Sequence, residues 1–204
     1  MADTIRSFIA LDLPGNIREQ IGQVQDDLKR DGLAARWVKP GNIHLTLHFF
    51  GDIAAERIES IRRAMSEAAA CAPLHLRARG IGVFPGIRKA RVIWVGVDGD
   101  RQLLPALQQR LAGALESIGF PTERRTFKAH LTLGRFRTPP NPERVARAVE
   151  ACQNFSSDPF VVSQLTMFES RLTPAGAIYT KIHEIPLDAG PAGRQPATAD
   201  RRTR

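Results

Sequence analysis

The sequence predicts an α+β protein of two similar lobes that enclose a central cleft. Segments typical of strands alternate with amphipathic helical segments, in the same order, in both halves of the chain. The tetrapeptide His-Leu-Thr-Leu stands at residues 44–47 and again at residues 130–133. The first copy begins 36 residues after Phe8 and the second 37 residues after Ile93, each the start of the first apolar strand of its half. This agreement favours an internal duplication.

The first half reads as strand, helix, strand, helix and strand. Residues 6–13 are largely apolar and end at a Pro-Gly pair, which predicts a buried strand followed by a turn. Apolar residues return every three to four positions in 16–30 and in 54–70, so two amphipathic helices are expected around the first motif strand. A strand over residues 74–84 closes this half.

The second half repeats the order. Residues 91–98 predict a strand, and a leucine at every fourth position of residues 101–119 predicts a helix that stops at Gly119. The second motif strand follows. A short helix over 142–152 and strands over 160–170 and 177–187 complete the half.

Length and composition fit one domain, residues 1–187, followed by a tail. Apolar residues make up 43% and charged residues 25% of the 204-residue chain, which is typical of a globular protein. The two lobes are expected at about 1–88 and 89–187, and an exchange of strands between them is left open. Residues 188–204 are rich in Pro, Ala, Gly and Arg, which predicts a disordered basic tail.

Composition also narrows the class of protein. The apolar run near the N-terminus covers only residues 8–11, too short for a signal-peptide core or a membrane span, so the expected compartment is the cytoplasm. Cys71 and Cys152 form neither a disulfide framework nor a metal-type pair, and both are expected to be reduced. The net charge of +8 weakly favours phosphate-bearing partners, and a solvated basic surface is the alternative.

The repeated tetrapeptide gives each motif strand a polar face. Side chains alternate along a strand, so His44 and Thr46 share one face, as do His130 and Thr132, while the leucines point to the other. Two such faces, packed about a pseudo-twofold axis, make a cleft lined by two imidazoles and two hydroxyls. A single strand histidine is usually structural, but folding alone does not require His and Thr in the same order twice.

The same alternation places His48 with His44 and turns Phe49 toward the helices. His44 and His48 lie about 13 Å apart on an extended strand, too far to bind one metal ion. The acidic residues are scattered and no His-x-x-x-His helical pair is present, so neither a metal nor another cofactor is expected. His48 is a candidate substrate contact at the mouth of the cleft.

Two histidines suit a reaction that needs a base and an acid at once, because one ring can be neutral while the other is protonated. Hydrolysis of a phosphodiester is such a reaction. The threonine hydroxyls and a nearby cation would hold the non-bridging oxygens as charge builds. Arg135 is the cation to test, although its odd spacing from His130 predicts the opposite strand face unless the strand bulges or twists.

At these residues the chain resembles the two-histidine (2H) phosphoesterases, whose signature is a pair of His-x-Thr/Ser-x motifs about 80 to 90 residues apart. The surroundings resemble the bacterial RNA 2′,3′-cyclic phosphodiesterase branch, also called 2′-5′ RNA ligase-like (LigT-like): "RSFIALDLP", "WVKPGNIHLTLHFFGD", "FKAHLTLGRF" and "FESRLTPAGAIYTKIHEIPL". The resemblance covers roughly residues 5 to 187. It departs at Ala129, where the family often has proline.

The resemblance implies two pseudosymmetric lobes, each a mainly antiparallel sheet with two helices packed outside. It implies hydrolysis of a terminal 2′,3′-cyclic phosphate on RNA to a 2′-phosphate, without metal, with reversible 2′-5′ joining of RNA ends as a side activity. The expected partners are RNA 3′ ends that bear the cyclic phosphate, or small cyclic nucleotides. The similar halves indicate that one chain completes the site, so a monomer is expected.

Carried over to this sequence, the family pattern makes His44 the proton donor and His130 the proton acceptor, with Thr46, Thr132 and Arg135 binding the phosphate. Further candidate substrate contacts can be named. Single-stranded RNA sites often stack bases on aromatic rings, so Trp37, Phe49 and Phe84 are candidates, although each is more often a core residue. Arg171 is a candidate for phosphate contact or a structural ion pair, and Tyr179 is expected to be structural.

Three alternatives stay open. The same cleft could hydrolyse a small cyclic phosphate of the ADP-ribose type or a 2′-5′ oligoadenylate, because specificity lies in loops rather than in the motifs. It could bind nucleotides or RNA ends without turnover, although binding alone would not need an acid and a base. An interaction module without an active site would leave His44 and His130 far apart or buried separately.

Overall fold

The computed structural model describes residues 3–122, 126–174 and 176–188, so most of the tail expected at 188–204 lies outside the described residues. The order of strands and helices confirms the α+β class. Its strands are β1 (Thr4–Leu11), β2 (Arg36–Trp37), β3 (Leu45–Ala54), β4 (Leu74–Phe84), β5 (Val92–Gly99), β6 (His130–Arg135), β7 (Phe160–Val162), β8 (Gln164–Thr173) and β9 (Gly176–Pro186). Its α-helices are α1 (Gly15–Arg30), α2 (Ile58–Ala68), α3 (Leu103–Ser117) and α4 (Pro142–Ala151).

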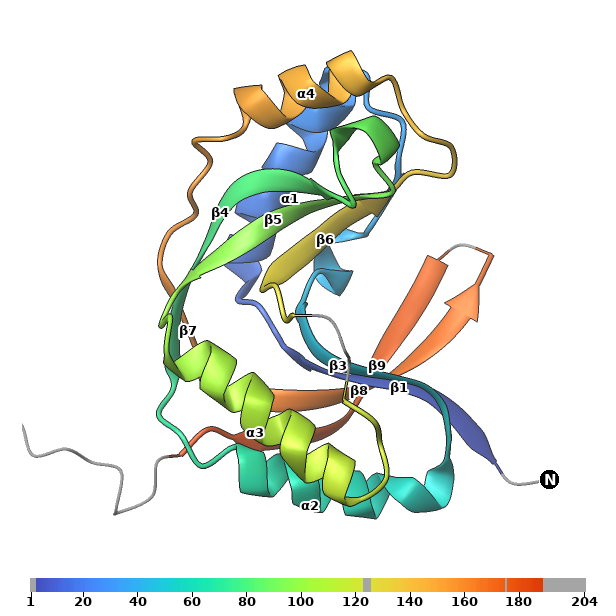
Figure 1. Ribbon diagram of the computed structural model, residues 1–204, viewed down its shortest axis with the longest axis vertical. Coiled ribbons are helices and arrows are strands. Elements are labelled where there is room, and N and C mark those ends of the chain that lie inside the picture. Colours follow the sequence, from blue (N-terminus) through green and yellow to red (C-terminus); the bar gives the residue numbers. More distant parts are fainter. Residues whose placement is uncertain (1–2, 123–125, 175, 189–204) are drawn as a thin grey trace, which may run out of the picture.

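Over the described ranges the strands form one curled sheet in the order β7-β4-β5-β6-β3-β1-β8-β9, with the short β2 paired to β6. Neighbouring strands along this path are antiparallel. The sheet is weakest between β3 and β6, which share only the residue pair Leu45 and Leu131. Because the ladder nearly stops there, the two parts of the sheet diverge and make two lobes (Figure 1).

We call the two parts the β3 lobe and the β6 lobe. The β3 lobe holds β1, β3, β8 and β9, with α2 and α3 packed together on its outer side (Figure 1). The β6 lobe holds β4, β5 and β6 with the short β2 and β7, and α1 and α4 cover it (Figure 1). Each lobe thus takes elements from both halves of the chain, and a division near residue 88 describes the sequence repeat rather than the lobes.

Helix α1 comes from the first half of the chain but covers the β6 lobe, and its contacts show what holds it there. Its apolar stripe, with Ile17, Ile21 and Leu28 fully buried, packs into the core as the periodicity predicted. The buried Gln25 on the same face donates to the carbonyl oxygens of Val38 and Leu133, at 2.8 and 2.9 Å. A buried amide must find such partners, so these bonds fix a helix of the first half against the motif strand of the second half.

Helices α2 and α3 bury the outer face of the β3 lobe. The sides they share are apolar, with Ile61, Met65, Leu107 and Leu111 fully buried. None of the helices in the described part of the chain is both long and apolar enough to cross a membrane. The helices therefore cover the outer faces of the lobes and leave the inner faces of the strands to form the cleft.

Candidate active site

The two motif strands meet at a pseudo-twofold centre. Leu45 and Leu131 are opposite residues of the antiparallel β3–β6 pair, and both are buried. Continued by one residue in each direction, this register would place His44 opposite Thr132 and Thr46 opposite His130. The two histidines are then diagonal neighbours, with backbones roughly 7–8 Å apart. One phosphate group can lie between two imidazoles at such a spacing.

Both copies of the motif carry a β-bulge at their fourth residue. Against β1, Thr46 pairs with Ala10 and His48 with Ile9, which leaves Leu47 without a partner. Against β5, the pairs run from Thr132 to Gly134 in the same way and leave Leu133 out. An extra residue in one strand reverses the alternation beyond it. The side chains after each bulge therefore point to faces opposite to those a regular strand would give them.

The bulge brings Arg135 into the site. A regular strand would set it opposite His130 and Thr132, but beyond the bulge it shares their face and lines the cleft. In the first copy the corresponding residue is Phe49, which is 45% exposed and also lines the cleft. The expectation that Phe49 points toward the helices is therefore wrong, and Phe50 packs against the core instead.

The bulge also removes His48 from the face of His44. His48 pairs with the fully buried Ile9, so its side chain lies on the core face, where its ring is 4.6 Å from the ring of Phe50. His48 is not among the described residues that line the cleft. The expectation of a shared face with His44 is wrong because it assumed unbroken alternation.

His44 lies among aromatic rings of the β3 lobe. Phe8 stacks on it with 4.5 Å between ring centroids, and Tyr179 meets it edge-on at 5.3 Å. Its Nδ1 donates to the Asn42 carbonyl at 2.8 Å, which leaves Nε2 for the cleft. Burial lowers the pKa of His44 from 6.5 to about 4, although the bond to Asn42 acts in the opposite direction. In the free protein the ring is neutral at pH 7.

His130 has the same backbone anchor but a different environment. Its Nδ1 donates to the Lys128 carbonyl at 2.6 Å, two residues earlier, as in the first copy. Its ring meets Phe84 edge-on, with 5.0 Å between centroids, and Trp94 at 6.3 Å. Each carbonyl can only accept, so both rings present Nε2 away from the backbone anchor. Two imidazoles with free Nε2 atoms are what paired proton transfer needs.

The cleft between the lobes has a volume of about 800 Å³ and a basic lining. His44, Thr46, Thr132 and Arg135 line it, and none of the described lining residues is Asp or Glu. Its further cations and aromatic residues are Arg6, Arg36, Lys39, Arg137, Phe8, Trp37, Phe49 and Tyr179. A cleft with several cations and no carboxylate attracts and holds anions.

The other residues named from the sequence are not all in this cleft. Trp37 lines it, next to Gly134 of β6. Phe84 contacts the ring of His130, although neither is among the described lining residues. Arg171 is exposed and lies between Ser170 and Leu172, which line the cleft, so alternation points its side chain away.

Several site residues carry no clear signal in the sequence. The sequence predicts a structural role for Tyr179, whereas in the structure Tyr179 touches His44 and lines the cleft. Phe8 is buried in a small cluster with Ala10 and Phe168, and its ring stacks on His44. Arg6 lies with its guanidinium 4.7 Å from the ring of Phe49, within reach of a cation–π contact. Arg6 and Phe8 alternate along one strand, the only sequence signal that could have pointed to them.

The described residues hold no group of three or more His, Cys, Asp or Glu side chains arranged for a metal ion. Asp12 lies on the other side of His44, along a separate cavity of about 320 Å³. It is ion-paired with Arg18 and lies 3.4 Å from the Lys181 ammonium. This carboxylate near His44 is thus engaged by two cations.

Known proteins share this sequence pattern and this fold. The family model described as LigT like Phosphoesterase matches residues 11–94 and again residues 95–179. A protein named RNA 2′,3′-cyclic phosphodiesterase from Methanothermobacter thermautotrophicus is 35% identical over 184 residues, which cover 90% of this chain and 99% of the relative. One of the same name from Thermotoga maritima is 29% identical over 187 residues, 91% of this chain and 97% of the relative.

Solved structures of other proteins have the same fold as this chain. TT0787 of Thermus thermophilus superposes with a TM-score of 0.74 at 25% identity, covering 91% of this chain and 100% of that one. Escherichia coli LigT complexed with 3′-AMP has a TM-score of 0.67 at 26% identity and covers 91% of this chain and 99% of its own. The resemblance and the fold predicted from the motif pair are confirmed.

Proposed function

Since the chain belongs to the LigT-like phosphoesterase family, and is an enzyme of that class, we propose that it hydrolyses the terminal 2′,3′-cyclic phosphate of RNA to a 2′-phosphate. The observation that carries the proposal is the meeting of the two His-x-Thr pairs about Leu45 and Leu131 in a cleft lined by cations. The relatives named RNA 2′,3′-cyclic phosphodiesterase support this substrate.

The reaction uses one histidine for each proton transfer. His130 accepts a proton from water as the water oxygen bonds to phosphorus, and the bond from phosphorus to the 3′ oxygen breaks. His44 donates a proton to that departing oxygen, which becomes the 3′ hydroxyl. The 2′ ester bond stays, so the product is a 2′-phosphate. The two rings then return to their starting protonation states by exchange with solvent, and no metal takes part.

His44 must be protonated to act as the acid, although its pKa is about 4 in the free protein. A phosphodiester carries a negative charge, and an anion beside an imidazole favours the charged form of the ring. We therefore expect His44 to take up its proton together with the substrate. Enthalpies of binding measured in buffers of different ionisation enthalpy report this uptake directly.

The groups around the histidines hold the phosphate. Thr46 and Thr132 lie on the same faces as the two rings and can donate their hydroxyl protons to non-bridging oxygens. Arg135 supplies a fixed positive charge beside them. Donors aimed at developing charge lower the barrier because they are already in place when the charge forms. One chain supplies all of these groups, which supports action as a monomer.

The test is incubation of the protein, in excess EDTA, with a short RNA that ends in a 2′,3′-cyclic phosphate, followed by identification of the phosphate isomer. We expect a 2′-phosphate with the wild type and none with His44→Ala or His130→Ala. The matched control is His183→Gln, which changes a histidine of β9 outside the described cleft lining. Binding without product by the wild type would replace the proposal with the binding-only function.

A further inference from the structure

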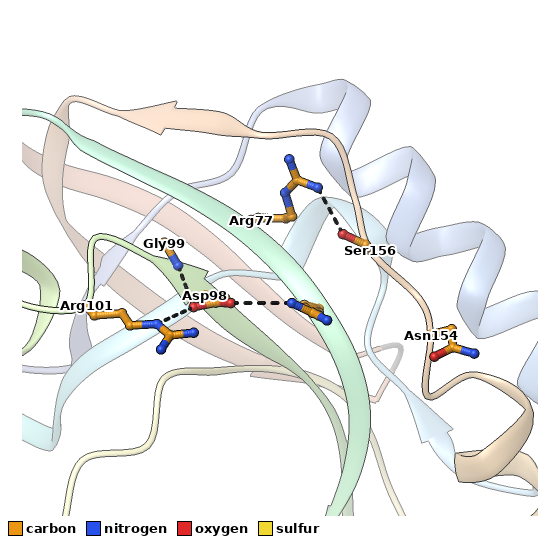
Figure 2. Close-up of a pocket in the computed structure, with 7 residues that line it drawn as sticks. Arg77, Asp98, Gly99, Arg101, Asn154 and Ser156 are labelled. Atoms are coloured by element: carbon orange, nitrogen blue, oxygen red, sulfur yellow. Dashed lines mark hydrogen bonds and ion pairs between the residues drawn. The ribbon is translucent and has the colours of Figure 1, made fainter.

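A second concavity lies on the β6 lobe, along β4 and β5 (Figure 2). It has a volume of about 530 Å³. Its lining residues, Arg77, Arg79, Asp98, Gly99, Arg101, Asn154 and Ser156, are all polar or glycine. None of them is among the described residues that line the cleft beside His44. The concavity is therefore distinct from the cleft between the lobes.

Its charge favours anions. The lining carries three guanidinium groups and one carboxylate, that of Asp98. Asp98 lies 3.2 Å from Arg101 and 3.9 Å from Arg79, and it also accepts from the Gly99 amide, so one carboxylate is shared by several donors (Figure 2). The side chains of Arg79 and Arg101 remain 66% and 83% exposed. Most of their donors are thus available to a ligand.

Arg77 and the polar residues complete the lining. Arg77 donates to the Ser156 hydroxyl at 3.3 Å, and Asn154 lies two residues before Ser156 on the same segment (Figure 2). Ser156 pairs with Arg79 in an isolated antiparallel bridge, so its side chain lies on the same face as Arg79. Arginine, serine and asparagine are side chains that commonly bind nucleic-acid phosphates.

The concavity shares a sheet face with the second histidine. Across the three strands, Arg79 pairs with Gly96 and Gly96 pairs with His130. Opposite residues of antiparallel strands project to the same side. The next residues in each strand, among them the buried Ala78 and Leu131, face the helices. His130 and Arg79 therefore project from the inner face of the β6 lobe, with one strand between them.

Gly96 lies between them without a side chain. A Cβ at this position would stand 2.8 Å from the Arg79 carbonyl oxygen and 3.6 Å from the Trp94 ring, so the strand β4 and that ring border the route between them. With two strand spacings between them, the backbones of His130 and Arg79 are about 10 Å apart. Arg77 lies two residues further along β4. A chain that starts at His130 can pass over Gly96 and reach both arginines.

We propose that Arg77, Arg79 and Arg101 bind backbone phosphates of the RNA strand that precedes the terminal cyclic phosphate. The inference rests on the proposed function, because the strand is placed by its end in the active site. A nucleic-acid strand suits this surface because it carries one phosphate per nucleotide, and the described lining offers several cations in series and no apolar or aromatic side chain for a base. The enzyme then binds RNA ends more tightly than free cyclic mononucleotides.

The test compares a pentanucleotide that ends in a 2′,3′-cyclic phosphate with adenosine 2′,3′-cyclic monophosphate. In the Arg77→Ala/Arg79→Ala variant we expect KM for the pentanucleotide to rise about tenfold, with kcat unchanged and both constants for the mononucleotide unchanged. The slope of log KM against log salt should fall by about 1.4, because each phosphate contact to a single strand accounts for about 0.7.

The matched control is Arg62→Ala/Arg63→Ala, which removes the same charge from the outer surface of α2. Equal KM values for the pentanucleotide in the two double variants would overturn the inference, as would an equal rise for the mononucleotide. If the wild type hydrolyses neither substrate, the proposed function fails. Fluorescence anisotropy with a pentanucleotide that ends in a 2′-phosphate then decides the inference: weaker binding by the Arg77→Ala/Arg79→Ala variant than by the control supports it, and equal binding overturns it.

Discussion

The two copies of His-Leu-Thr-Leu share their backbone and differ in their surroundings. In each copy the histidine Nδ1 donates to the carbonyl two residues earlier, and the fourth residue forms a bulge. His44 is nevertheless stacked on Phe8 with a pKa of about 4, whereas His130 meets its aromatic neighbours edge-on. The tetrapeptide thus fixes the orientation of the ring, and the lobe around it adjusts the ring's chemistry.

The sixth position of each copy differs as well. Arg135 follows one bulge and Phe49 the other, and both line the cleft. In the β3 lobe the positive charge comes instead from Arg6, which lies over the ring of Phe49. The same backbone position therefore carries a cation that lines the cleft in one lobe and an aromatic support for a cation in the other.

The largest effect should come from removing either ring. We expect His44→Ala and His130→Ala each to lower kcat by about 10³-fold, because each variant loses one proton carrier and such a group contributes about 10²- to 10⁴-fold. Single-turnover rates on the cyclic-phosphate RNA give the numbers. If either variant keeps near-wild-type turnover, the two histidines do not act as an acid and base pair.

A substrate with a good leaving group separates the two roles. With a 4-nitrophenyl phosphodiester, the departing oxygen needs no proton. His44→Ala should then lose far less activity than His130→Ala, because only the base is still required. Equal losses, or a larger loss in His44→Ala, would reverse or remove the assignment of acid and base.

The burial of His44 predicts that the free energy of unfolding depends on pH. Because the pKa of His44 falls from 6.5 to about 4 on folding, between these pH values the unfolded chain binds a proton that the folded chain does not. The free energy of unfolding should decrease from about pH 7.5 to pH 4 by about 3 kcal/mol through this ring, and the ring should contribute little pH dependence above about pH 7.5.

Urea unfolding of the wild type and of His44→Asn measures this contribution. Asparagine can still donate to the Asn42 carbonyl but does not titrate, so its stability should depend less on pH over this range. His130→Asn is the matched control in the other lobe. If His44→Asn loses stability with falling pH as steeply as the wild type does, burial of His44 is not the cause.

Substitutions at the sixth position of each copy, Arg135 and Phe49, should lower kcat/KM by smaller and unequal factors. Arg135→Ala removes the cation that we propose binds the phosphate, and we expect kcat/KM to fall by about 10²-fold. Phe49→Ala leaves Arg6 without its aromatic support, worth about 0.5–1 kcal/mol, so a fall of about two- to fivefold is expected. Steady-state kinetics on one RNA substrate compare the two. Equal losses would mean that the lobes hold the phosphate symmetrically.

The smallest effect concerns the anchor of His44. The Asn42 amide donates to the Ala177 carbonyl of β9 at 2.8 Å, so the residue whose carbonyl holds His44 is itself tied to the β8–β9 hairpin. Asn42→Ala should lower the free energy of unfolding by about 1 kcal/mol. Lys128→Ala, which changes the corresponding residue beside His130, is the control in the other lobe. A stability unchanged by Asn42→Ala would show that the tie is not needed.

Predictions from the sequence are confirmed for helices, whose positions depend on residues close together in the chain. Apolar periodicity placed α1 and α3 to within two residues of their ends, and the tetrapeptide identified His44 and His130. Predictions are wrong where the face on which a side chain lies depends on pairing with a neighbouring strand. Whether Leu47 is paired depends on β1, and that pairing moved both Phe49 and His48 to unexpected faces. The condition set for Arg135, a bulge in its strand, is met.

By itself the sequence determined the order of elements, the duplication and the His-Thr pairs, because the alternation of side chains along a strand and the turn of a helix are set by nearby residues. Only the tertiary structure decided the exchange of α1 into the β6 lobe and the aromatic rings around His44. It also decided the row from His130 across Gly96 to Arg79. These features join segments distant in sequence, and packing between those segments selects the register, the burial of His44 and so its pKa.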